Sequence, residues 1–235
     1  MIHGAVAGNH GKSATLLVYE LKFLSRRGTR IKEADILFEF KKASDTSLGP
    51  QVSEIRPDGV FKMEETLQNE ASNQSLSFNV GPDMPGVDAG MNLSREQSKS
   101  KEKKYYTTIV GENPPDLDFG YHTQARFRLE ENKSQETGIP SAITVAILLE
   151  REDDEDFVML PHIEVTPNFK FTTLITSLTS SRSTDDPIFF SVREPLLNDL
   201  TPSVSIDENK LELVNLDDLW DCTLFNSYGR AIKKR

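Results

Sequence analysis

The most concentrated group of chemically capable side chains in this sequence is the acidic run 150–156, which reads EREDDED. Ca²⁺ takes six to eight oxygen ligands, so carboxylates converging on one loop could hold it, with Asp153, Asp154 and Asp156 as candidate ligands. The alternative is a solvated hairpin tip whose charges discourage edge aggregation of two apolar strands. A basic protein partner could also bind this run, which makes interaction candidates of Glu152, Asp153, Asp154, Glu155 and Asp156.

The remaining reactive residue types do not form a catalytic or metal-binding pattern. The four histidines have no metal-ligand spacing, Cys222 has no second cysteine, and no GxSxG nucleophile motif occurs. Gly11-Lys12-Ser13 resembles the end of a phosphate-binding loop, but Val6 stands where the first glycine is required and a strand follows instead of a helix. We therefore expect no cofactor, and a non-enzymatic role is favoured over an enzymatic one.

Alternating apolar and polar residues predict the elements that must position these groups. Residues 15–24, 34–41 and 125–130 alternate as strands with one wet face do, whereas residues 143–149 are nearly all apolar, as in a central strand covered on both faces. Further short strands are expected at residues 52–55, 60–63, 105–110, 157–165, 169–175 and 188–192. The fold class predicted is an all-β, antiparallel β-sandwich of about eight to ten strands.

Two connections carry specific pairing expectations. The short polar connection 25–32 predicts that strands 15–24 and 34–41 are antiparallel neighbours. The turn Pro57-Asp58-Gly59 predicts a hairpin between strands 52–55 and 60–63.

The domain organisation expected is one sandwich, residues 14–201, between a flexible N-terminal tail (1–13) and a C-terminal appendage (202–235) that packs on it. Residues 81–104 contain three Gly, two Pro and no aromatic residue, which predicts a long disordered insertion. In the appendage, Val214–Cys222 is a candidate for a short helix capped by Asn215, with a strand or irregular tail as the alternative. Leu216, Leu219 and Trp220 would then face inward.

Charge and composition narrow the choice of partners and compartment. The formal charge is −10, and residues 107–235 hold 23 Asp and Glu against 12 Lys and Arg, so wholesale nucleic-acid binding is not expected. The longest apolar run is far shorter than the roughly 18 residues that span a bilayer. A single cysteine and the lack of a secretion signal predict a cytoplasmic location, and the basic residues 233–235 leave a nuclear one open.

Several stretches resemble a family of uncharacterised β-rich proteins of filamentous fungi. Residues 126–132 (RFRLEEN), Gly138-Ile139-Pro140 and strand 145–149 carry the resemblance, and residues 50–59 and 186–190 extend it over most of the chain. Phe127 and residues 191–192 depart from the family's pattern. The family has no assigned activity, so the resemblance implies a β-rich fold and no catalytic residue. Asn132 is an interaction candidate, because a polar side chain at a strand end can tie two loops together or contact a ligand.

Three functional hypotheses follow from these residues. The leading one is a non-enzymatic, intracellular module that binds an unknown protein partner. The second is a C2-like lipid- or calcium-binding module that uses the acidic run 150–156. The third is a carbohydrate-active β-sandwich, for which a groove lined by Trp220 or by exposed tyrosines would be the indication.

Overall fold

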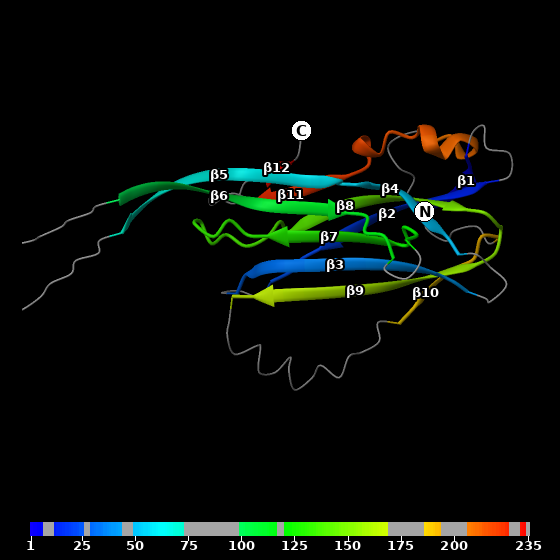
Figure 1. The fold of residues 1–235 in the computed structure, drawn as a ribbon, viewed down its shortest axis with the longest axis horizontal. Coiled ribbons are helices and arrows are strands. Elements are labelled where there is room, and N and C mark those ends of the chain that lie inside the picture. Colours follow the sequence, from blue (N-terminus) through cyan, green and yellow to red (C-terminus); the bar gives the residue numbers. More distant parts are fainter. Residues whose placement is uncertain are drawn as a thin grey trace, which may run out of the picture.

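A computed structural model of the chain describes residues 1–6, 12–25, 29–43, 49–72, 99–116, 120–168, 186–193, 206–225 and 231–233. These residues form twelve strands and two short 3₁₀ helices, arranged as two stacked sheets (Figure 1). All strand pairs in both sheets are antiparallel. The predicted antiparallel β-sandwich is therefore confirmed, with more strands than the sequence suggested.

Each sheet combines strands that are distant in the sequence. In sheet A the order is β1 (Ile2–Ala5), β2 (Ser13–Lys22), β8 (Ala142–Arg151), β11 (Asp221–Phe225) and β12 (Ala231–Lys233), with β4 (Gln51–Arg56) also paired to β8. In sheet B the order is β10 (Ile188–Phe190), β9 (Phe157–Pro167), β3 (Ile31–Lys42), β7 (Gln124–Glu130), β6 (Lys99–Glu112) and β5 (Gly59–Ser72). Figure 1 shows β5 and β6 running out together beyond the other strands at one end.

Apolar side chains fill the space between the sheets and also cover the outer face of sheet A. The main core contains the inward-facing residues of both sheets, among them Phe40, Phe127, Phe157, Ile147 and Leu149. A second cluster lies outside sheet A, where η1 (Glu208–Leu213) packs on β1 and β2 and η2 (Leu216–Asp218) lies beside β4. Strand β8 is thus buried on both faces, as its apolar sequence predicted.

The two expected strand pairings are wrong. β2 lies in sheet A and β3 in sheet B, and the same separation holds for β4 and β5, so neither pair is a neighbour in a sheet. The turn at Pro57 carries the chain from one sheet to the other, where a side chain on Gly111 would lie only 1.9 Å from the Pro57 carbonyl oxygen. The acidic run also joins strands of different sheets, β8 and β9, so it is not a hairpin tip.

The ends of the predicted segments differ from the structure in several places. Ile2–Ala5 form β1 within the expected N-terminal tail, and residues 99–104 belong to β6 and not to the expected insertion. Residues 81–98 and the strand predicted at 169–175 lie outside the described residues. In the appendage Asn215 caps η2, which has only three residues, and 221–225 continue as a strand; Leu216, Leu219 and Trp220 are buried as expected.

Candidate functional site

Asn132, the polar residue singled out at the end of a strand, is fully buried just after β7. Its Nδ2 donates to the main-chain oxygen of Glu64 at 2.7 Å and lies 3.0 Å from Thr66 Oγ1. Its Oδ1 accepts from the main-chain N–H of Ser134 at 3.0 Å. β5 is bulged between Met63 and Thr66, with Glu64 at a φ of 53°, so the amide supplies the bulge with a donor. Asn132 therefore ties the loop after β7 to the bulge of β5, and its role as an interaction residue stays a prediction.

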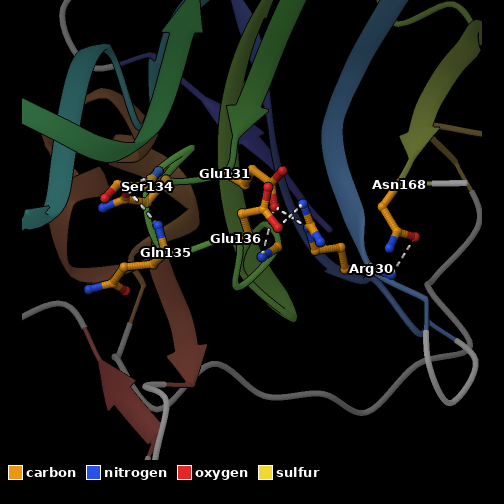
Figure 2. A network of polar contacts seen from close by, with 8 residues as sticks. Arg30, Glu131, Ser134, Gln135, Glu136 and Asn168 are labelled. Carbon is orange, nitrogen blue, oxygen red and sulfur yellow. Dashed lines mark hydrogen bonds and ion pairs between the residues drawn. The ribbon is translucent and has the colours of Figure 1, made fainter. Parts of the chain in front are cut away.

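The neighbouring Glu131 organises an ionic network that the sequence did not single out (Figure 2). Its Oε2 accepts from Arg30 Nε at 2.8 Å and from the main-chain N–H of Gly138 at 3.1 Å. Arg30 Nη2 also lies 3.1 Å from Glu136 Oε2, and the Arg30 main-chain N–H donates to Asn168 Oδ1. The hydrogen bond to Glu131 raises the pKa of Arg30. This network fastens the loop after β7 to the start of β3 and the end of β9.

Two shallow depressions flank Arg30. One, of about 130 Å³, is lined by Phe23, Ser141 and the segment Thr137–Ile139. The other, of about 380 Å³, has a rim of mixed charge that includes Lys32, Lys133 and Glu136. The charged rim residues include both signs, and Arg30 is already paired with two carboxylates, so the network holds the loop after β7 in place.

The carboxylates of the acidic run point to separate partners. Glu150 Oε2 lies 3.4 Å from Lys12 Nζ, and Asp154 Oδ1 accepts from Ser13 Oγ at 2.6 Å. Asp156 Oδ1 accepts from the main-chain N–H of Val192 at 3.0 Å. Within the described residues, no group of three or more His, Cys, Asp or Glu side chains is placed to hold a metal ion.

Arg151 lies within the acidic run and is buried, with only 3% of its surface exposed. Its Nη1 donates to the main-chain oxygen of Asp153 at 3.3 Å and lies 3.8 Å from Asp154 Oδ1. Burial lowers the pKa of this guanidinium, and the two aspartates act in the opposite direction. Glu152 is exposed, and Glu155 Oε1 lies 3.8 Å from Arg193. Part of the acidic run therefore compensates a buried cation.

Trp220, the residue proposed for a carbohydrate groove, is only 5% exposed. Its ring meets Phe61 edge-on at 4.8 Å between centroids, and its Nε1 donates to Asp217 Oδ1 at 3.2 Å. Tyr19 is packed against Phe38 at 5.5 Å. Tyr121 is exposed, but Trp220 has no free ring face on which a sugar could stack.

Sequence reasoning also missed a stretch of β9 (residues 161–166) whose side opposite β3 pairs with no strand among the described residues; we call it the β9 edge. Ile163 pairs with Ile36 and Val165 with Ala34, both fully buried, so these side chains lie on the core face of sheet B. Ile163 is nevertheless 49% exposed and Val165 43%. On the adjacent strand β10, Ile188 and Phe189 are exposed as well. The signal available in the sequence was Pro161, because proline within a strand marks a sheet edge.

Comparisons with known proteins add no relative to this description. No protein-family model matches the chain, and no curated protein sequence is significantly similar to it. Among the described residues, no helix is long and apolar enough to cross a membrane. The class that the fold defines is an all-β sandwich, and any function must be inferred from the chain's own residues and contacts.

Proposed function

We propose that this protein is a non-enzymatic, intracellular interaction module that presents the β9 edge to a protein partner. The observation that supports the proposal is a strand edge that exposes the apolar side chains of Ile163 and Val165 and has no partner strand in the described part of the chain. A bare strand edge is a template for pairing with another chain, and natural proteins usually protect such edges with charge, bulges or a cover. Ile163 and Val165 give the β9 edge no charge on its core face.

The alternatives have less support. Calcium or lipid binding through the acidic run would need carboxylates that converge, whereas Glu150, Asp154 and Asp156 bind three different groups. A carbohydrate site would need an exposed aromatic ring for the sugar to stack on, and the ring of Trp220 is buried. The kinship with the fungal family and the cytoplasmic location stay predictions.

Site-specific photo-crosslinking in native extract tests this function. A photoreactive phenylalanine analogue is introduced into the full chain at position 163, on the β9 edge. The control carries the analogue at position 213, because Leu213 is 70% exposed but lies in η1, on the outer side of sheet A. We expect a discrete protein adduct from position 163 and none from position 213.

A second substitution makes the result specific for the β9 edge. Val165→Glu places a charge in the apolar strip and should abolish the adduct from position 163, whereas Leu213→Glu should leave it unchanged. Circular dichroism of both variants checks that they fold. An absence of adduct at position 163, or an adduct that survives Val165→Glu in a folded protein, would refute the proposed function.

A further inference from the structure

The geometry points to a second copy of this chain as the partner at the β9 edge. We propose that two copies pair their β9 strands antiparallel about a two-fold axis that passes beside Val165, joining sheet B of one copy to sheet B of the other. This inference rests on the proposed function, since it names the partner for the same surface.

Hydrogen bonds on the far side of β3 fix which main-chain groups of β9 face outward. The main-chain N–H of Phe40 donates to the oxygen of Thr123, which leads into β7, at 2.8 Å. In an antiparallel strand successive residues bond to opposite sides, so even-numbered residues of β3 bond toward β7 and odd-numbered residues toward β9. Consistently, the N–H of the odd-numbered residue Ala43, just after β3, donates to the oxygen of Asp156, just before β9.

The register between β3 and β9 then gives the free groups. Asp35, an odd-numbered residue, is opposite Glu164, so the even-numbered residues of β9 bond toward β3. The N–H and C=O groups of Ile163 and Val165 therefore point outward in the plane of the sheet, on the side of β9 opposite β3. The C=O of Pro161 points to the same side. Among the described residues no strand pairs with them, because β10 pairs only with residues 157–159 of β9.

Of the two-fold centres at Ile163, Glu164 and Val165, only Val165 avoids both strand β10 and a pair of facing Glu164 side chains. Pairing about Ile163 would place the partner's residue 167 opposite Met159, where Ile188 of β10 already lies. Pairing about Val165 places Val165 opposite its own copy and Ile163 opposite Pro167. Two Val165 N–H groups then donate to Val165 oxygens, and two Ile163 N–H groups donate to Pro167 oxygens across the axis.

The side chains suit this register. On the core face, Val165 meets Val165 and Ile163 meets Pro167, so each copy covers the apolar strip of the other. On the outer face, Glu164 lies opposite Thr166, and no like charges face each other at the centre. A symmetric dimer needs a surface that is complementary to itself, and an antiparallel strand edge has this property in its backbone.

Disulfide trapping tests the register directly. In Val165→Cys the two introduced thiols belong to one hydrogen-bonded pair, with Cα atoms about 5.5 Å apart, within the range of a disulfide. In the matched control Ile163→Cys, the equivalent atoms are four residues apart along the strands, roughly 13 Å. The native Cys222 is 1% exposed and does not compete. With mild oxidant we expect a covalent dimer from Val165→Cys and at least tenfold less from Ile163→Cys.

Sedimentation equilibrium of the untagged full chain measures the assembly itself. We expect a concentration-dependent dimer, which becomes a monomer in Val165→Glu and persists in Leu213→Glu. A monomer at all concentrations, or equal trapping of Val165→Cys and Ile163→Cys, would overturn the inference. If the photo-adduct from position 163 then contains a different protein, the proposed function stands without the dimer; if the chain is monomeric and forms no adduct, both fail. In that case residues 169–185, which follow β9, become the candidate occupant.

Discussion

Truncation of the buried amide of Asn132 should strongly destabilise the sandwich. Asn132→Ala removes the donor to the Glu64 oxygen (2.7 Å) and the acceptor for the Ser134 N–H (3.0 Å). A polar group left without its partner inside a protein costs about 1–3 kcal/mol, so two such groups lower the free energy of unfolding by about 2–6 kcal/mol. Such a loss is a large fraction of the stability of an ordinary domain, which is about 5–15 kcal/mol.

Urea unfolding followed by tryptophan fluorescence measures this loss, since Trp220 is a buried reporter. Asn132→Asp separates the two halves of the amide, because it keeps an acceptor for Ser134 but turns an oxygen toward the Glu64 carbonyl. We expect Asn132→Asp to be nearly as destabilising as Asn132→Ala, and the exposed control Lys133→Ala to be neutral. A loss below about 1 kcal/mol for Asn132→Ala would refute the role assigned to the amide.

Three further predictions follow from close packing and burial. Gly111→Ala should lower the melting temperature markedly, because its new Cβ would lie 1.9 Å from the Pro57 oxygen; unchanged thermal unfolding would contradict this contact. Burial, with a smaller effect of Asp221, raises the pKa of Cys222 from 9.0 to about 12, so stability should fall as pH rises from 9 toward 12, where the unfolded thiol ionises first. Urea unfolding across this range should show a smaller fall in Cys222→Ala. Burial, followed by the charge of Arg151, lowers the pKa of His3 below 6.5, so stability should fall as pH drops below 6.5, because the unfolded imidazole takes up the proton first. The same titration in His3→Gln should be flatter, and an equally steep curve would count against a buried neutral His3.

The alternation of residues was sufficient to predict most strands but not their partners. Residues 34–41 alternate in the sequence and lie within β3, because the period of two follows directly from one buried and one wet face. That period contains no information on which strand lies alongside. A short connection such as 25–32 can turn back within a sheet or step across to the opposite one, and here it steps across.

The polar sites were predictable only in part, because each depends on residues far apart in the sequence. Asn132 was recognisable from its place at a strand end, but its partner Glu64 sits in a bulge that no local pattern announces. Arg30 and Glu131, 101 positions apart, form a pair through tertiary structure alone. The burial of Arg151 likewise could not be read from an acidic run in which it looked like one more exposed charge.

Strand β8 pairs with β2, β4 and β11, so sheet A cannot be completed until β8 has been synthesised. Leu16 in β2 pairs with Leu148 in β8, about 130 residues later. At ribosomal rates of roughly 5–20 residues per second, β2 waits roughly 6–25 s for its partner. Throughout that interval β2 has β1 beside it but not β8, so its apolar residues Leu16 and Leu17 are not yet buried. Until residue 151 has left the exit tunnel, these side chains are therefore open to contact with chaperones or with other nascent chains.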